Sequence, residues 1–303
     1  MKYVLITPAR NEGAFIKMTL DSVFAQTIPP ERWVIVDDGS TDNTAEIVAP
    51  FAEQVSWIEL LRCEQRADRN FAGKVYALRA GLERVQSIDF EIIGNLDADV
   101  SFDADYLEFL IRKFEEDLKL GVTGTPFTEN SRYDSTRDSF EGENHVAGGC
   151  QLFRRRCLEE IGGYVPNGIG GIDWMAVTTA RMRGWRTRSF PEKRFHHYRS
   201  LATAERIGRG SLFSYGEKDH YLGGSPLWQV FRVTYRRAKP PVIVRGLALL
   251  AGYCWAALRR MKRPISRELM RFHRREQMKK LRLIIGMILR GQKVNSFCLA
   301  TEQ

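Results

Sequence analysis

The stretch Ile92-Ile93-Gly94-Asn95-Leu96-Asp97-Ala98-Asp99-Val100 decides the fold of this chain. It is an apolar run that ends in two carboxylates one residue apart. On a buried strand Asp97 and Asp99 point the same way, because side chains alternate faces with a period of two. Two buried like charges are costly without a partner. Oxygen ligands suit Mg²⁺ or Mn²⁺ bridging to phosphate, so the pair indicates a metal site. The alternative for an isolated Asp-x-Asp is a surface turn.

Strands and helices alternate around this segment. Short apolar runs typical of buried strands lie at 3–7, 33–36, 55–61 and 90–96. Apolar residues at helical spacing separate them. This alternation predicts a three-layer α/β fold with a mostly parallel, Rossmann-like sheet flanked by helices. Ligands bind such sheets at the carboxyl ends of the strands, where the turns at 8–12 and 37–40 and the Asp97/Asp99 pair all fall.

The turns lack the glycine-rich motifs of two common classes of nucleotide-binding protein. Neither G-x-G-x-x-G nor a P-loop pattern follows the first strand, so metal and basic side chains are expected to hold a phosphate. Asp37 or Asp38 suits hydrogen bonding to the N–H or ribose hydroxyl groups of a nucleoside. The alternative is that one of them, Asp38 rather than Asp37, caps a helix that starts near Ser40.

Charge is distributed unevenly along the 303 residues. Residues 1–150 carry 15 Lys and Arg against 27 Asp and Glu, whereas residues 151–303 carry 31 against 10, so the net charges are −12 and +21. The basic half needs an anionic partner, for which nucleic acid and an anionic membrane surface are the candidates. The five cysteines show no C-x-x-C spacing and no signal peptide is evident, so a cytoplasmic protein is expected.

Several ordered motifs resemble those of family 2 glycosyltransferases with the GT-A fold. The resemblance covers roughly residues 1–200. The matching segments are Pro8-Ala9-Arg10-Asn11-Glu12, Val36 to Asp42, Gly73 to Gly81, Asp97-Ala98-Asp99, Gly148 to Arg155, Ile161 to Tyr164, Ile172-Asp173-Trp174, Arg183-Gly184-Trp185 and His196-His197. These motifs are specific for the family, but they say little about which sugar is transferred.

The resemblance implies a role for each matching residue. The residues implied to bind a nucleotide-sugar donor are Pro8, Ala9, Arg10, Glu12, Asp37, Gly73, Lys74, Asp97 and Ala98. Asp99 is the implied direct ligand of a divalent metal, Mn²⁺ or Mg²⁺, with Asp97 contacting hydroxyl groups or a metal-bound water. His197 is the first choice to complete the metal shell and His196 the second.

Asp173 is the implied catalytic residue. Inverting transfer needs one carboxylate to take the proton of the acceptor hydroxyl as that oxygen attacks the anomeric carbon. The family's Glu-Asp pair is Ile172-Asp173 here, so a neighbouring acid is missing. The alternative role for Asp173 is to cap the helix that runs to Met182.

The basic extension at 201–303 is expected to be helical and to associate with a membrane. Residues 1–100 would form the nucleotide-sugar half of the catalytic domain 1–200, and residues 101–200 its acceptor half. Three placements are open for the apolar segment Val242–Leu258: it spans the membrane, it lies in the membrane interface, or it packs as a core helix. The arginines and lysines that flank it favour the interface.

The function expected from these features is metal-dependent inverting transfer of a sugar to a glycan or polyprenyl-linked acceptor. The enzyme would be cytoplasmic and peripheral on the inner face of the cell membrane. A sugar-1-phosphate nucleotidyltransferase is the alternative, but residues 7–13 lack its G-x-G-[ST]-R loop. A non-catalytic nucleotide- or membrane-binding module is a further alternative. Nucleic acid is not expected as a partner, since no known binding motif accompanies the basic residues.

Overall fold

A computed structural model of the chain describes residues 1–64, 71–129, 133–138, 142–199, 209–236, 243–292 and 294. Its contacts divide the chain into two compact units. The first comprises residues 1–168 and 172–200, and the second comprises residues 169–171 and 201–303. The predicted donor and acceptor roles of the two halves of the first unit remain predictions.

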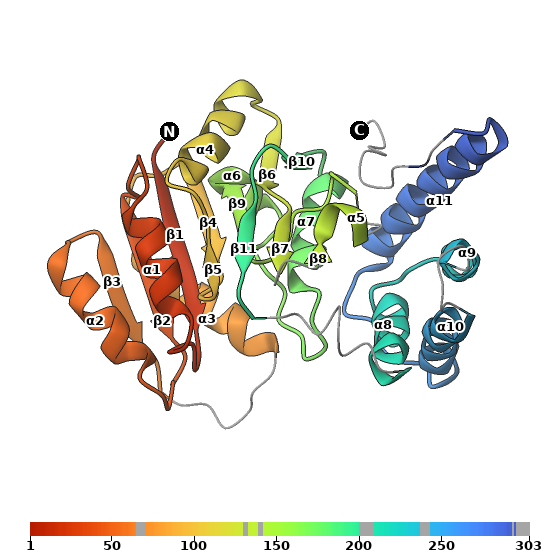
Figure 1. Ribbon diagram of the computed structural model, residues 1–303, viewed down its shortest axis with the longest axis horizontal. Helices are drawn as coiled ribbons and strands as arrows, with labels where there is room; N and C mark the ends of the chain where they lie inside the picture. The colour runs from red at the N-terminus through yellow and green to blue at the C-terminus, as the bar shows by residue number, and fades with distance from the viewer. Residues whose placement is uncertain are drawn as a thin grey trace. The chain divides into compact units, whose positions relative to one another are not determined.

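A seven-stranded sheet forms the centre of the first unit (Figure 1). Its strands are β1 (Tyr3–Ala9), β2 (Arg32–Asp37), β3 (Ile58–Arg62), β4 (Ile92–Leu96), β6 (Leu120–Gly124), β9 (Cys150–Arg154) and β10 (Arg186–Ser189). They lie in the order β10-β6-β9-β4-β1-β2-β3. Strand β9 runs antiparallel to both of its neighbours, and all other pairs are parallel. The expected mostly parallel sheet is therefore confirmed.

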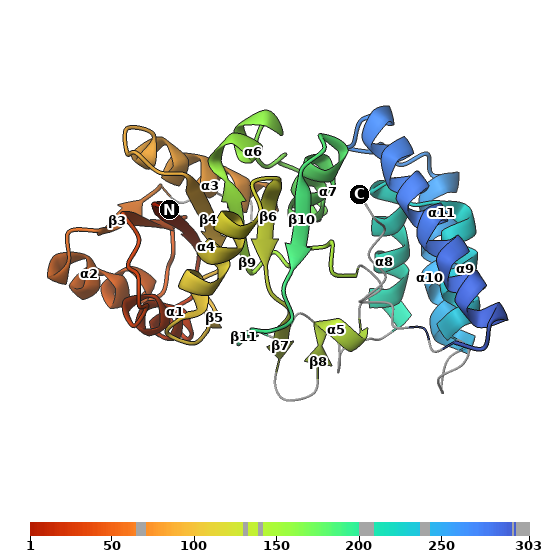
Figure 2. The ribbon, with the colours of Figure 1, turned by 90° about the horizontal axis from the view of Figure 1, so that it is seen from above.

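Helices cover both faces of this sheet (Figure 2). The helices on one face are α1 (Ile16–Phe24), α2 (Thr44–Gln54) and α4 (Tyr106–Glu116), and those on the other are α3 (Phe71–Val85), α6 (Arg155–Glu160) and α7 (Ile172–Met182). Alternation along β1 explains the two layers. Leu5 belongs to the core that α1, α2 and α4 share. Ile6 points the other way, where an added Cβ on Gly81 of α3 would lie 2.5 Å from it.

A second, small sheet lies beside the carboxyl end of β4. It consists of β5 (Val100–Ser101), β11 (Phe195–His197), β7 (Phe127–Glu129) and β8 (Tyr133–Asp134), in that order. Strand β11 runs antiparallel to β5 and parallel to β7. The short helix α5 (Ser135–Asp138) follows β8. This sheet connects the segment after Asp99 with residues almost a hundred positions later.

The second unit contains the helices α8 (Arg209–Tyr221), α9 (Pro226–Arg236), α10 (Ile243–Leu258) and α11 (Arg267–Leu289). Helices α8 and α10 pack closely, because an added Cβ on Gly216 or Gly252 would meet the backbone of the other helix at 2.0 and 1.9 Å. The outer side of α10 exposes Leu247, Trp255 and Leu258. Val242, at the start of the apolar segment, lies outside the described residues. Among the helices described, none has the length and apolarity needed to cross a membrane.

The turn after β2 is longer than the sequence suggested. Helix α2 begins at Thr44 rather than near Ser40, with Asn43 as its N-cap. Hydrogen bonds hold the intervening turn: the Ser40 amide donates to Asp37 Oδ1 at 2.9 Å, and the Thr41 amide donates to Asn11 Oδ1 at 2.8 Å. The backbone of this turn is therefore engaged before the helix starts, and neither Asp37 nor Asp38 caps α2.

Candidate functional site

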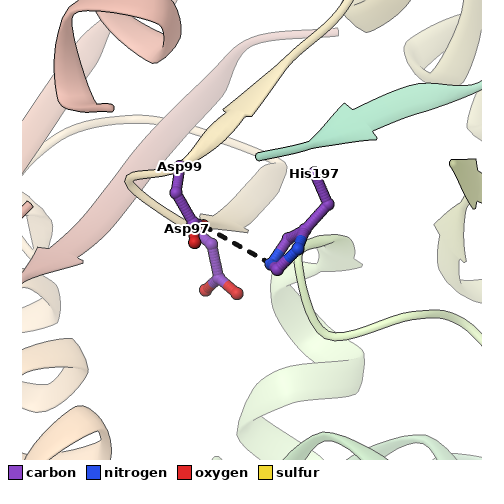
Figure 3. A group of neighbouring side chains, drawn as sticks. All are labelled: Asp97, Asp99 and His197. Atoms are coloured by element: carbon purple, nitrogen blue, oxygen red, sulfur yellow. Dashed lines mark ion pairs between the residues drawn. The ribbon is translucent and has the colours of Figure 1, made fainter. Parts of the chain in front are cut away.

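Asp97, Asp99 and His197 form a cluster at the carboxyl end of β4 (Figure 3). One ligand atom from each lies within 4.8 Å of the others. Asp97 follows β4, Asp99 precedes β5, and His197 lies on β11, where it pairs with Val100. The amide of Tyr198 donates to Asp99 O at 2.9 Å, which fastens this end of β11 beside Asp99. Two carboxylates and one imidazole are thus presented to the same point.

Histidine 197, and not His196, reaches the carboxylates. His197 Nε2 lies 3.5 Å from Asp99 Oδ1, and the ring is buried. His196 points to the other face of β11, where its Nδ1 is 3.5 Å from Thr128 Oγ1 and its ring packs edge-on against Tyr198. The alternation of side chains along a strand separates the two histidines.

Asp99 is a buried carboxylate with cationic neighbours. Burial and, next, the charge of Asp97 raise its pKa, whereas His197, Arg199 and Lys74 act in the opposite direction. Arg199 Nε lies 3.6 Å from Asp99 Oδ2. An added cation at this point would relieve the repulsion between the two carboxylates that raises the pKa.

Lys74 projects from α3 to the cluster and pairs with Asp97. Burial of Lys74 lowers the pKa of its amine, but the charges of Asp97, Asp173 and Asp99 outweigh burial and the pKa is raised. Lys74 therefore carries a positive charge among three carboxylates. Gly73, beside it, leaves room for Asp38, whose Oδ2 would lie 3.2 Å from a Cβ at that position.

The turns after β1 and β2 are joined to each other at the same edge. Ala9 O accepts the amide of Asp38 at 2.8 Å, and Arg10 Nη1 lies 3.9 Å from Asp38 Oδ2. Asn11 has a left-handed φ of 56° and links to the second turn through Thr41. Pro8 and Ala9 are the last two residues of β1, opposite Val36 and Asp37. All residues of the expected donor loops thus lie at one edge of the sheet.

Glu12 extends this edge toward the cluster of Asp97, Asp99 and His197. Its Oε2 is 2.5 Å from Arg199 Nη2, and its amide donates to Thr44 Oγ1 at 2.9 Å. Burial, and then the charge of Asp99, raise the pKa of Glu12 to about 7, although the ion pair with Arg199 acts against this. Glu12 and Asp99 therefore share the charge of a single guanidinium.

Asp173 is the second residue of α7 and lies in its first turn rather than at its N-cap. Its side chain packs against Gly148, where an added Cβ would lie 2.9 Å from Asp173 Oδ2. The next residue, Gly149, accepts the Asp97 amide through its carbonyl at 2.9 Å. The Gly148-Gly149 segment thus places Asp173 next to the Asp97 backbone.

Two residues of this site were not expected from the sequence, Arg199 and Glu129. Arg199 follows His197 by two positions, beyond the end of β11, so its nearness to His197 along the chain was the signal that could have found it. Glu129 ends β7 and is buried, with its Oε1 3.7 Å from His197 Nδ1. Only the pairing of β7 with β11 reveals that proximity.

Comparison with known proteins identifies the family. A family model described as "Glycosyl transferase family 2" matches residues 4–162, which includes Lys74, Asp97 and Asp99 and ends before Asp173 and His197. The chain is 35% identical over 121 residues to the poly-beta-1,6-N-acetyl-D-glucosamine synthase of Staphylococcus aureus (strain COL), covering 40% of this chain and 27% of that protein. It is 30% identical over 172 residues to the synthase of the same name from Staphylococcus epidermidis, covering 50% and 39%. The chain therefore spans less than half the length of these relatives.

Solved structures share the fold. The mannosyltransferase PcManGT from Pyrobaculum calidifontis, in complex with GDP-Man and Mn²⁺, matches with a TM-score of 0.55 and 22% identity over 96% of this chain and 81% of that one. S. aureus TarS 1-349, in complex with UDP-GlcNAc, matches with a TM-score of 0.55 and 14% identity over 98% and 90%. These likenesses confirm the GT-A fold. Because the family model matches more than half of the 303 residues, the chain belongs to glycosyl transferase family 2.

Proposed function

We propose that the protein transfers a sugar, with inversion, from a nucleoside diphosphate sugar to a hydroxyl group of an acceptor. The observation that carries this proposal is the convergence of Asp97, Asp99 and His197 beside Lys74 and Asp173, at the strand edge where the donor loops meet. The family match supports transferase chemistry. The nucleotide sugars named with structures of the same fold, GDP-Man and UDP-GlcNAc, support the donor class.

The ligand cluster fits a divalent metal ion. Carboxylate oxygens and an imidazole nitrogen are the ligands that Mn²⁺ accepts, and Mg²⁺ accepts the carboxylates. Burial, and then the charge of Asp97, raise the pKa of Asp99, so a divalent cation bound between the two carboxylates would stabilise their charged forms. Asp99 and His197 would hold the ion, with Asp97 as a further ligand or a partner of bound water. When bound, such an ion offsets negative charge on the departing diphosphate.

Asp173 would act as the general base. Its carboxylate takes the proton of the acceptor hydroxyl while that oxygen forms a bond to the anomeric carbon. The bond from the same carbon to the diphosphate oxygen breaks, and the electron pair leaves with the nucleoside diphosphate. Attack from the face opposite the leaving group inverts the anomeric centre. Positioned proton transfer of this kind contributes about 10²–10⁴-fold in rate.

Lys74 and the donor loops would orient the nucleotide sugar. The amine of Lys74 is charged and lies beside Asp97, Asp99 and Asp173, where it would bind the negative charge of the diphosphate. Arg10 and Asp37 lie on the two joined turns and would contact the ribose and base. Pro8, Ala9, Glu12, Gly73 and Ala98 complete the proposed donor-binding residues.

The proposed acceptor is a growing glycan or a polyprenyl-linked sugar, presented at the inner face of a membrane. The relatives named as poly-beta-1,6-N-acetyl-D-glucosamine synthases support a glycan acceptor. In the second unit, α10 exposes Trp255 and Leu258, and the Arg259 guanidinium lies 5.5 Å from the Trp255 ring centroid. An apolar face bordered by cations is typical of a helix that lies in a membrane interface.

Two substitutions test the proposal. Asp99→Asn should abolish transfer and the Mn²⁺-dependent part of nucleotide binding, because a neutral amide is a poorer ligand for a hard cation. Asp173→Asn should preserve donor binding and lower turnover by about 10²–10⁴-fold. Asp103→Asn, which changes an exposed acid four positions after Asp99, is the matched control. The measurements are transfer from UDP- and GDP-sugars and calorimetric binding of the nucleotides with and without Mn²⁺.

Two results would contradict the assignment. Full activity of Asp99→Asn in chelator-treated buffer would show that the site works without metal. Loss of nucleotide binding by Asp173→Asn, with turnover at saturation preserved, would move Asp173 from the chemistry to the donor site.

A further inference from the structure

The two ring nitrogens of His197 have different surroundings. Nε2 faces Asp99, and the opposite nitrogen, Nδ1, is buried without a hydrogen-bond partner within the described part of the chain. A neutral imidazole that binds metal through Nε2 carries its proton on Nδ1, and that proton needs an acceptor. The atom that faces Nδ1 is Glu129 Oε1, at 3.7 Å.

We infer that Glu129 is a positioning residue that accepts the Nδ1 proton of His197 and thereby fixes the ring as an Nε2 ligand. This inference rests on the proposed metal site. A carboxylate behind a metal-binding histidine sets its tautomer and orientation and raises its basicity. The observed separation of 3.7 Å is slightly longer than a hydrogen bond, and such contacts shorten when the ligand is in place.

Strand pairing fixes Glu129 behind His197. Strands β7 and β11 are parallel, with Phe195 opposite Phe127 and His196 opposite Thr128, so His197 and Glu129 are the next pair. The stacked rings of Phe127 and Phe195, 5.4 Å apart, hold this register from within the core. Neither side chain therefore depends on a loop for its position.

Glu129 is a buried acid on the face of β7 that lies beside His197 of β11. The residue is 2% exposed, and a buried carboxylate is costly unless it is paired or hydrogen-bonded. Its neighbour on the same strand, Thr128, faces His196 on the opposite side. The acid thus lies on the one face of β7 from which it can act on His197.

The experiment measures Mn²⁺ binding to the full chain by calorimetry, without nucleotide, for Glu129→Gln, Glu129→Leu and the matched control Thr128→Val. Glu129→Leu should weaken Mn²⁺ binding by about 10–100-fold, the usual effect of removing such a partner. Glu129→Gln keeps an acceptor oxygen, so a loss of only a few fold is expected. Thr128→Val should bind like wild type. In a His197→Ala background, Glu129→Leu should cause no further loss, because Glu129 acts through the ring.

A second measurement keeps the inference independent of metal. Nitrogen-15 NMR of the metal-free protein should show the His197 proton on Nδ1 in wild type, and a shift toward Nε2 in Glu129→Leu. Unchanged Mn²⁺ affinity and an unchanged tautomer in folded Glu129→Leu would overturn the inference. An equal loss of affinity with and without His197 would also overturn it, since Glu129 would then act on the fold. If wild type fails to bind Mn²⁺ while the tautomer still depends on Glu129, the proposed metal site fails and the positioning role stands.

Discussion

Replacing Gly148 by alanine tests whether the Gly148-Gly149 segment sets the position of Asp173. The new Cβ would lie 2.9 Å from Asp173 Oδ2 and 3.0 Å from Asp173 Cβ. Unstrained contacts between such atoms are about 3.5 Å or longer, so one partner must move by about 0.5 Å. The segment itself is held, because Gly149 O binds the Asp97 amide and Gly149 packs against the Phe195 ring. Asp173 is therefore the group that moves.

The expected loss follows from this displacement. A misplacement of about 1 Å in a catalytic group costs about 10²-fold in rate, so a shift half as large should lower turnover about 10-fold. Nucleotide and Mn²⁺ binding should be preserved, because Asp173 is not proposed to contact either. The assay is steady-state transfer at saturating donor and acceptor, with the nucleotide dissociation constant measured by calorimetry.

Gly286→Ala is the control, because a Cβ at that position of α11 meets nothing within 4 Å. Combining Gly148→Ala with Asp173→Asn should add little to the loss caused by Asp173→Asn alone. Turnover of Gly148→Ala within two-fold of wild type would refute the reasoning. A parallel loss of nucleotide affinity would show instead that the segment, and with it Asp97, had moved.

Three further predictions concern Glu12, Asn11 and the second unit. The pKa of Glu12 is raised to about 7 from a model-compound value of 4.5, so the folded chain binds the proton more tightly. The free energy of unfolding should therefore fall as pH rises from about 4.5 to 7, by about 1 kcal/mol after solvent screening. Urea titrations in chelator-treated buffer measure this dependence, and Glu12→Gln should remove it. Asn11→Ala should lower the free energy of unfolding by about 2 kcal/mol, because alanine adopts the left-handed φ at a cost and the hydrogen bond to Thr41 is lost. Asn11→Gly loses only the hydrogen bond, so its loss should be about half as large. Equal losses for the two variants would refute a conformational cost at this position. In co-sedimentation, the full chain should bind anionic vesicles less as the salt concentration rises, and Trp255→Ser should bind them more weakly than wild type. Binding that does not depend on salt, or equal binding to neutral vesicles, would contradict a helix that lies in the membrane interface.

The convergence of three segments at one edge of the sheet was predictable because each of its signals is local. An apolar run ending in Asp97 and Asp99, and turn residues after two earlier runs, are enough to place three segments at one edge of a parallel sheet. The start of α2 was missed because Asn11, thirty residues before Thr41, holds the intervening turn. Glu129 was missed because its proximity to His197 depends on the pairing of β7 with β11, strands more than sixty residues apart. Local patterns do not specify which distant strands pair.

The short strands of the small sheet make this site sensitive to changes in chain length. Asp99 and His197 meet only because β5 and β11 pair with His197 opposite Val100. Inserting or deleting a single residue in β11 ahead of His196 would turn the following side chains to the other face and bring His196, instead of His197, to the side of Asp99. Insertions in surface loops elsewhere do not change which side chains of β11 face Asp99. When relatives of this chain are aligned, a gap inside β11 would thus be a stronger sign of a lost site than most amino-acid replacements.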